Sequence, residues 1–313
     1  MTEDPTKRAA CLLVPALVCA IAVGAAFAGT TQKLLPDGSL HTIVVEPRAA
    51  DGAGTRLTDR VLAPDGSVSA TVLPGTDDSA VEADPVLAVD AVTHLPVAFW
   101  TRTDGGSSEI NFAFHNGKTW SMRAALTTNS FPDMRARAIA GRSGLVHVMW
   151  EAILPGTGQT SYFHAVLSKE GKVVLPPTEI RLGAFASDPL TGLPAENIGD
   201  DEIFFVIGAS SKSGRTIVHA FGGIDEPIPI VHRGIFVLPD GSPQPDSVAV
   251  ESVGSRSVLL VRGPRAVIFS ARAVEGWMPY GSLSFDQIGA DRAELLIREM
   301  LSSPGSPLNP PVP

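Results

Sequence analysis

A pattern of short apolar stretches that recurs about every 50 residues constrains this sequence more than any other feature. Four segments begin with an aspartate that leads into an apolar stretch, and their starts are 49, 55 and 58 residues apart: Asp84, Asp133, Asp188 and Asp246. A period of this length is typical of proteins built from repeated supersecondary units.

Each of the four segments is followed by a denser hydrophobic stretch and then by a third one. The second stretches are residues 95–100, 145–150, 203–207 and 258–261. The third stretches begin near Ile110, Tyr162, Ile217 and Val267 and lead into predicted turns at Gly117, Gly171, Gly222 and Gly276. Four short strands per unit are typical of a β-propeller blade, whose inner strands are buried on both faces and are therefore apolar almost throughout. We expect Trp100 and Trp150, at matching places, to pack between blades.

An incomplete unit precedes these four. Residues 39–45 and 56–73 have the pattern of a second, third and fourth strand, without a first one. A closed ring of blades must hide its edges, and a strand from the other chain end commonly closes it. We predict that residues 281–288 supply the missing strand, which gives an all-β, propeller-like array of about five four-stranded blades over residues 29–288.

The region after the array, residues 289–313, has a different character. Leu295, Leu296, Ile297 and Met300 have helical spacing, and Asp291 lies near the start of this stretch, where a helix dipole favours an anion. The sequence predicts a short C-terminal helix followed by a Pro- and Ser-rich tail that is extended or disordered.

The N-terminal segment, residues 1–28, predicts export. Residues 9–28 form an uncharged run after Lys7 and Arg8, an arrangement that holds the N-terminus on the cytoplasmic side. Ala26 and Ala28 would allow cleavage before Gly29, whereas the length of the run also suits an uncleaved membrane anchor. Either way, the rest of the chain is expected to be periplasmic or extracellular, and it stays associated with the membrane through residues 9–28 if they are not cleaved.

Composition excludes several kinds of chemistry. Both cysteines, Cys11 and Cys19, lie in the N-terminal segment, so the exported part has no thiol for a disulfide, a nucleophile or a metal ligand. The net charge of −9 disfavours nucleic acid, whose binding requires clustered cations. No phosphate loop, dinucleotide fingerprint or nucleophile elbow is present, so we predict no cofactor.

One unit contains four short motifs in order: Asp84-Pro85, Val97-Ala98-Phe99-Trp100, Ile110-Asn111-Phe112 and Gly117-Lys118-Thr119-Trp120. This series of motifs resembles the sialidase-type propellers that carry Asp-box repeats. The pattern extends over residues 84–279. The boxes depart from the family pattern, because Ala113 and His115 stand where the family has Ser and Asp.

This resemblance implies a propeller fold and, in its enzymes, a sialidase site. Such a site uses three arginines around the substrate carboxylate and a tyrosine nucleophile paired with a glutamate. The chain has two tyrosines, Tyr162 and Tyr280, both in or beside predicted strands. Nothing in the spacing of Arg135, Arg137 and Arg181 selects them as the arginine cluster.

The four repeated aspartates are the candidate binding residues. Equivalent places in successive blades lie on one rim of a ring, so Asp84, Asp133, Asp188 and Asp246 could form an acidic collar for a cation or a basic peptide, with raised pKa values. The alternative is that each aspartate only forms a hydrogen bond within its own turn.

Three other groups of polar residues are weaker candidates for a site. Asp200, Asp201 and Glu202 form the densest acidic run, but no EF-hand spacing accompanies them, so a solvated loop is the simpler interpretation. Glu151 could act as a general acid if it lay beside a second carboxylate. The seven histidines contain no close ligand pair, and the apolar surroundings of His147, His164 and His219 favour neutral, hydrogen-bonded imidazoles over a metal site.

Two functional hypotheses follow for the propeller-like array, and a third possibility is that the C-terminal helix and Pro-rich tail dock a partner. The first is a non-catalytic, extracytoplasmic binding or accessory module for a protein or glycan partner, since no catalytic set is evident on a scaffold that presents a rigid binding face. The second is a divergent glycan-processing hydrolase of the sialidase-like type, with Asp133 and Glu151 at the mouth of the ring.

Overall fold

The computed structural model describes most of the repeated region. The described residues are 30–48, 54–157, 160–180, 194–198, 202–210, 216–237, 247–253, 256–262, 266–273 and 276–284, with Arg292 and Leu296. The predicted N-terminal segment lies outside them. The predicted C-terminal helix and tail also lie outside them, apart from Arg292 and Leu296, which are both helical.

The strands form five antiparallel sheets of four, each in chain order. Blade 1 contains β1 (Thr30–Leu34), β2 (Leu40–Pro47), β3 (Thr55–Leu62) and β4 (Val68–Val72). Blade 2 contains β5 (Val81–Val89), β6 (Pro96–Asp104), β7 (Ser107–Phe114) and β8 (Ala124–Ala125). Blade 3 contains β9 (Asp133–Ala140), β10 (Val146–Ile153), β11 (Thr160–Leu167) and β12 (Val173–Ile180). Blade 4 contains β13 (Pro194–Ile198), β14 (Glu202–Ser210), β15 (Thr216–Ile224) and β16 (Val231–Val237). Blade 5 contains β17 (Ser247–Val253), β18 (Arg256–Arg262), β19 (Ala266–Ala273) and β20 (Gly276–Ser284).

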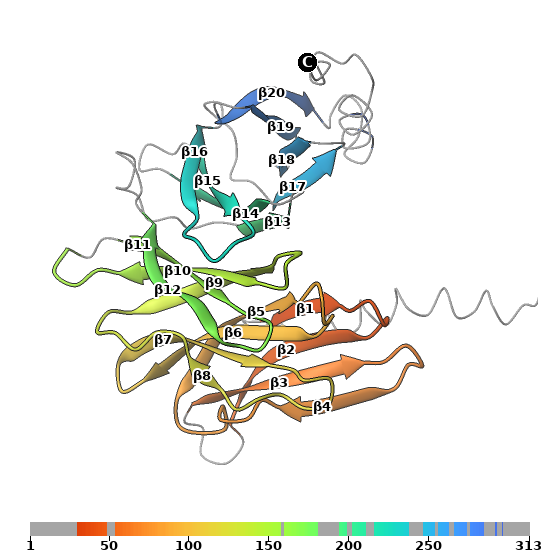
Figure 1. Ribbon diagram of the computed structural model, residues 1–313, viewed down its shortest axis with the longest axis vertical. Helices are drawn as coiled ribbons and strands as arrows, with labels where there is room; N and C mark the ends of the chain where they lie inside the picture. Colours follow the sequence, from red (N-terminus) through yellow and green to blue (C-terminus); the bar gives the residue numbers. More distant parts are fainter. Residues whose placement is uncertain are drawn as a thin grey trace, which may run out of the picture.

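Successive blades are neighbours through their first strands. β1 lies beside β5, β5 beside β9, β9 beside β13 and β13 beside β17. Figure 1 shows the sheets following one another from blade 1 in red and orange to blade 5 in blue. The all-β, propeller-like array of five four-stranded blades is therefore confirmed, and so are its predicted second and third strands.

The second strand of a blade is buried on both faces, as its apolar sequence predicts. In β6, every residue from Pro96 to Arg102 is buried, and side chains alternate between the two neighbouring blades. Phe99 therefore joins an apolar cluster with blade 3, whereas Trp100 joins another cluster with blade 1. Trp150 faces blade 2 in the same way, so the expected packing of both tryptophans between blades is confirmed.

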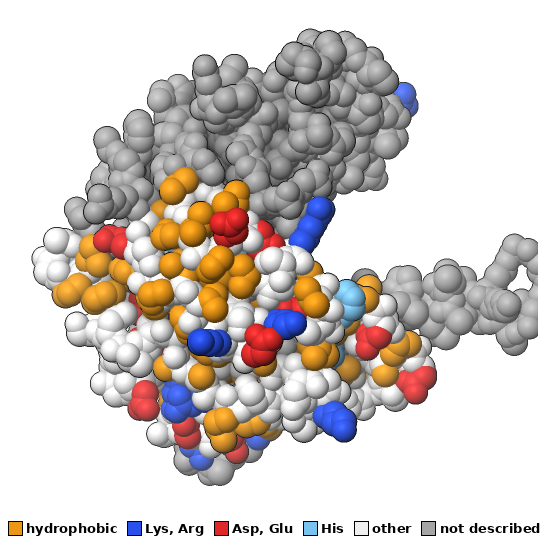
Figure 2. Space-filling model, in the orientation of Figure 1, with side chains coloured by type: hydrophobic (Ala, Val, Ile, Leu, Met, Phe, Trp, Pro, Cys, Tyr) orange, Lys and Arg blue, Asp and Glu red, His pale blue; other side chains and the backbone are white. Residues whose placement is uncertain are grey.

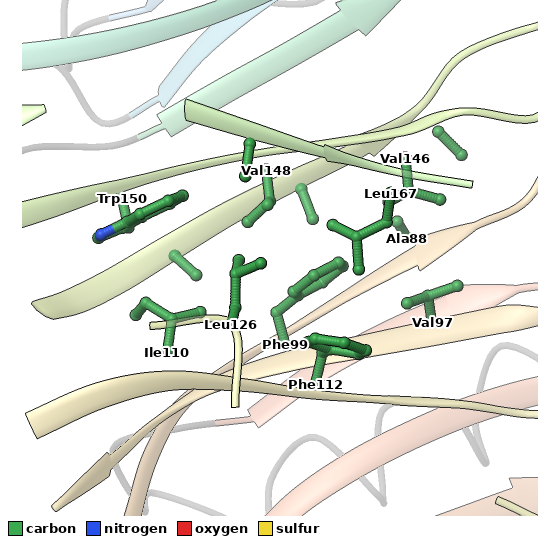
Figure 3. Packing of buried hydrophobic residues seen from close by; sticks show 14 residues of the cluster. Ala88, Val97, Phe99, Ile110, Phe112, Leu126, Val146, Val148, Trp150 and Leu167 are labelled. Atoms are coloured by element: carbon green, nitrogen blue, oxygen red, sulfur yellow. The ribbon is translucent and has the colours of Figure 1, made fainter. Parts of the chain in front are cut away.

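Three apolar clusters fill the joints between the first four blades. Among the described residues, the cluster between blades 2 and 3 has the most members, with Phe99, Ile110 and Phe112 against Val148 and Trp150 (Figure 3). Full burial of one such side chain contributes roughly 1.5–3 kcal/mol, so this packing holds consecutive blades together.

Two details of the prediction were wrong. The first strand of blade 1 is its own β1, which pairs with β2, and the segment expected to close the ring instead forms the end of β20, paired with β19. Residues 285–288 lie outside the described residues. Gly222 lies within β15, and the turn after that strand follows Ile224.

The surface has a mixed charge pattern. On the face of the described residues shown in Figure 2, acidic and basic side chains are interspersed among apolar ones, and neither sign forms one large patch. A mixed surface gives no broad electrostatic attraction, so recognition on this face depends on particular groups of side chains.

The contact between Gly171 and Phe114 gives a test of blade packing. Gly171, in the turn before β12, has φ of +79°, and a Cβ there would overlap the Phe114 ring of blade 2. Gly156 has φ of +80° with nothing within 4 Å of such an atom. We expect Gly156→Ala to lower the free energy of unfolding by about 1 kcal/mol through backbone strain alone. Gly171→Ala should lower it by about 1–3 kcal/mol more, through overpacking, in denaturant titration. Equal losses in the two variants would contradict the contact.

Candidate functional site at two bulged strands

A buried carboxylate accepts the indole N–H of a tryptophan at the same place in blades 2 and 3. Trp100 Nε1 donates to Glu82 Oε2 at 2.6 Å, and Trp150 Nε1 donates to Asp133 Oδ1 at 2.8 Å. Asn129 donates to the other oxygen of Asp133. Glu82, which the sequence analysis did not identify, is therefore the equivalent of Asp133. The sequence does contain a pattern that could have identified Glu82, because a carboxylate precedes each tryptophan by 17 or 18 residues.

Burial dominates the electrostatics of these two carboxyl groups. It raises the pKa of Glu82 to about 7, although Arg102 and Trp100 act in the opposite direction. Burial also raises the pKa of Asp133, against its hydrogen bonds from Trp150 and Asn129. Arg102 in turn binds Asp78, so Glu82 belongs to a structural network of charges.

Two residues past each of these carboxylates the inner strand bulges. In β5, the two residues Asp84 and Pro85 lie opposite the single residue Trp100 of β6. In β9, Arg135 and Ala136 lie opposite Trp150 of β10, so each first strand has one extra residue at this point. Asp84 (φ 48°) and Arg135 (φ 52°) adopt the left-handed conformation, which is uncommon for residues other than glycine. Asp84 therefore corresponds to Arg135, and the predicted register of the repeat was wrong by two residues at this point.

The bulge of β9 places Arg135 against Glu151 of β10. The Arg135 amide donates to Thr101 Oγ1 of blade 2 at 3.2 Å, and its guanidinium Nη2 donates to Glu151 Oε2. Arg137 Nη2 lies 3.8 Å from Glu151 Oε1. The side chain of Glu151 is 2% exposed and that of Arg135 is 38% exposed, so a buried carboxyl lies behind an accessible cation.

Opposing influences act on the protonation of Glu151. Burial raises its pKa, Arg135 and Arg137 lower it, and the negative charge of Asp84 raises it. Its Oε1 atom is buried without a hydrogen-bond partner among the described residues. The carboxyl group is thus available for a further proton or hydrogen bond.

Tyr162 lies directly opposite Glu151 in the register of β10 and β11. Opposite residues on neighbouring strands project from the same face, so both side chains point toward blade 4. Tyr162 is 1% exposed and its ring packs against Phe221. The sequence could not show this pairing, because it depends on the strand register.

The four predicted rim aspartates are only partly described. Asp84 is exposed at its bulge, and Asp133 is fully buried against Trp150. Asp188 and Asp246 lie outside the described residues, so the acidic collar stays a prediction. Asp200, Asp201 and Arg181 also lie outside them, and Glu202 is the first residue of β14.

Two histidines that are distant in sequence form a buried chain of hydrogen bonds between blades 3 and 4. The Ile230 amide donates to His164 Nδ1 at 3.3 Å, so the proton of the neutral His164 ring is on Nε2. That atom lies 3.2 Å from His147 Nδ1, and His147 Nε2 lies 3.2 Å from Asp225 Oδ1. Burial lowers the pKa of His147 and lowers that of His164 to about 3. The expectation of neutral, hydrogen-bonded imidazoles is confirmed for these two residues.

Within the described ranges, no three His, Cys, Asp or Glu side chains are arranged to hold a metal ion. No helix among the described residues has the length and apolar character needed to span a membrane.

Comparisons with known proteins give similarity of structure only. No protein-family model matches the chain. No curated protein matches it significantly. A crystal structure of the polysaccharide lyase Uly1 is similar with a TM-score of 0.51 and 8% identity, over 80% of this chain and 68% of the lyase. A mutant of the NanB sialidase from Streptococcus pneumoniae is similar with a TM-score of 0.52 and 8% identity, over 82% of this chain and 61% of the sialidase. These similarities show the propeller fold, and the resemblance seen in the sequence is confirmed at that level.

The histidine chain predicts a loss of stability in acid. A histidine whose pKa is lowered by folding contributes stability that is present above its unfolded pKa of about 6.5 and is lost as the pH falls below that value. We expect His164→Asn, whose side-chain oxygen can still accept from Ile230, to be less stable at pH 7. Between pH 6.5 and 4, the free energy of unfolding of this variant should fall less steeply with decreasing pH than that of wild type, by up to about 1.4 kcal/mol per pH unit.

Urea titrations across this pH range would measure the effect. His94→Asn is the matched control, because His94 is exposed and has φ of +58°, a conformation that asparagine tolerates. Parallel pH profiles of wild type and His164→Asn would contradict the assigned hydrogen-bond chain.

Proposed function

We propose that this protein is an exported glycan-processing enzyme of the sialidase-like propeller type, and that Glu151, Arg135 and Arg137 form the centre that acts on a carboxylate-bearing sugar. The observation that carries the proposal is Glu151 itself, a buried carboxyl between two arginines, one oxygen of which has no hydrogen-bond partner within the described ranges. The fold shared with a lyase and a sialidase favours this hypothesis over a non-catalytic module.

The arginines suit the acidic group of such a sugar. A guanidinium binds a carboxylate through paired hydrogen bonds, and Arg135 is exposed enough to be reached from solvent. A substrate carboxylate would compete with Glu151 for Arg135. Glu151 would then lose the partner that lowers its pKa while burial continues to raise it, so it would become protonated on substrate binding.

A protonated Glu151 is suited to act as general acid toward the glycosidic oxygen. The second carboxylate of the centre would be Asp84, whose charge already raises the pKa of Glu151. Asp133, the second carboxylate of the earlier hypothesis, is fully buried and bound to Trp150, so it serves to hold the strand instead. Tyr162, which lies opposite Glu151 in the strand register, would be the counterpart of the tyrosine that pairs with a glutamate in the sialidase pattern.

A non-catalytic glycan-binding role is the second candidate. It is favoured by the burial of Tyr162, which is 1% exposed and packed against Phe221. In that case the arginines would hold a sugar carboxylate and no bond would be broken.

Substitution of Glu151 tests the enzymatic proposal. On a panel of sialosides, aryl glycosides and uronic-acid polysaccharides, we expect wild-type turnover, and we expect Glu151→Gln to lower kcat by about 100-fold or more on the substrate that is turned over. Glu170→Gln, in the exposed turn before β12 of the same blade, should retain wild-type activity. Absence of wild-type turnover on the whole panel would contradict catalysis. Binding that is lost in Arg135→Ala would then support the second candidate.

The location of the protein is a separate proposal. We infer that residues 9–28 carry it across the inner or plasma membrane and tether it there if they are not cleaved. N-terminal sequencing of membrane and soluble fractions should find Met1 in the membrane or Gly29 in the exported soluble fraction. An intact Met1 in the cytoplasmic fraction alone would contradict export.

A further inference from the structure

The joints between blades use equivalent positions in different ways. The second residue of the second strand and its near neighbour on the third strand face the next blade together. These pairs are His41 and Asp59 in blade 1, Val97 and Phe112 in blade 2, and His147 and His164 in blade 3. The joint between blades 2 and 3 is therefore apolar at this level, and the two joints on either side of it are polar.

At this level, the buried histidines of the joint between blades 3 and 4 are fully hydrogen-bonded. Each of the four ring nitrogens of His147 and His164 has a partner, and Asp225 also accepts hydrogen bonds from the amide and hydroxyl of Ser143. Asp225 comes from the turn between the third and fourth strands of blade 4 and occupies the space at the end of the chain of hydrogen bonds.

The polar joint between blades 1 and 2 is not satisfied in the same way. Asp59 Oδ2 accepts from Trp120 Nε1 at 2.9 Å and contacts His41 Nδ1 at 2.8 Å. Asp59 is 2% exposed, yet its Oδ1 is buried without a hydrogen-bond partner in the described part of the chain. Leaving such an oxygen unpaired costs about 1–3 kcal/mol, so this position calls for a donor.

A cavity lies beside this carboxylate. It has a volume of about 290 Å³ and is lined by both blades, with Asp59, His41, Ser69 and Thr71 on one side and His115 and Lys118 on the other. Small-molecule sites usually have volumes of roughly 300–1,000 Å³, so the space suits a single sugar ring better than an oligosaccharide. Ser69, Thr71 and Lys118 are exposed, which gives a ligand access from solvent.

We propose that this cavity is a binding site for a hydroxyl-rich ligand of monosaccharide size, with Asp59 and His41 as the hydrogen-bond acceptors at its base. Because Nδ1 of His41 donates to Asp59, Nε2 is an acceptor when the ring carries one proton. His115 Nδ1 accepts from the Gly117 amide at 3.2 Å, so its Nε2 is a donor. The lining thus offers acceptors and donors together, as vicinal hydroxyl groups require.

The same lining disfavours an ammonium ligand. An ammonium group can only donate hydrogen bonds, so although Asp37 and Asp59 would attract its charge, it would leave the donors Lys118 and His115 without an acceptor. A hydroxyl group donates to Asp59 and accepts from Lys118 or His115, so it uses both kinds of group.

The cavity is separate from the centre around Glu151. His41 follows the turn from β1 to β2, and His94 in the turn from β5 to β6 also lines the cavity. Glu151 and Arg135 lie near the end of β10 and the start of β9, which is the opposite end of the inner strands. The proposal therefore does not depend on whether Glu151 is catalytic.

Saccharide titrations of the full-length protein test the site. Glucose, galactose, mannose and N-acetylglucosamine would be compared by saturation-transfer-difference NMR and calorimetry, with methylammonium as the cationic competitor. We expect at least one sugar to bind and methylammonium to bind more weakly. Asp59→Asn should weaken sugar binding by about tenfold or more. Its amide oxygen would keep the hydrogen bonds from Trp120 and His41, so an N–H group would take the place of the acceptor Oδ1.

A second variant keeps the test independent of any folding defect in Asp59→Asn. Ser69→Trp should fill the cavity without touching the buried hydrogen bonds and should abolish binding. Val68→Trp is its matched control on the opposite face of β4 and should bind like wild type. Failure of all four sugars to bind, unchanged binding by Ser69→Trp, or tighter binding of methylammonium than of any sugar would each overturn the proposal.

Discussion

A buried indole N–H that needs a hydrogen-bond acceptor determines how the first and second strands of blades 2 and 3 pair. Trp100 and Trp150 lie on strands that are buried on both faces, so neither indole can bond to water. An unpaired donor there would cost about 1–3 kcal/mol, and each blade supplies a carboxylate from its first strand to prevent this. Glu82 and Asp133 are themselves expensive to bury, which is why further hydrogen bonds from Arg102 and Asn129 hold them.

The polar joints between blades also help to specify the order of the blades. Repeated units of similar shape could in principle pack against the wrong neighbour, because an apolar face accepts many partners. The pair His41 and Asp59 requires the indole of Trp120, and His147 requires the carboxylate of Asp225. A misplaced blade would leave these buried groups without partners, so the polar joints favour one arrangement over its alternatives.

Periodicity in the sequence predicted the blades, since an inner strand buried on both faces must be apolar whatever its neighbours are. It could not show β1, whose residues Thr30–Leu34 are mostly exposed and have no apolar pattern. The bulges were also missed. Asp84 was matched with Asp133 because both are aspartates before an apolar stretch, whereas the strand pairing matches Asp84 with Arg135. Contacts that depend on strand register, such as Glu151 with Tyr162, were also beyond the reach of the sequence.

The conformation of Arg135 is the strongest argument that its bulge serves more than stability. Glycine is the ordinary residue at a left-handed position in a bulge, and another residue there costs of order 1–3 kcal/mol. Arg135 is held in place from two sides, through its amide by Thr101 of blade 2 and through its guanidinium by Glu151 of blade 3. The equivalent residue of blade 2, Asp84, is also charged and strained. Both bulges keep a charged side chain where glycine would relieve the strain. The two charges act in opposite directions on the pKa of one buried carboxyl, which supports the proposed role of Glu151 over packing alone.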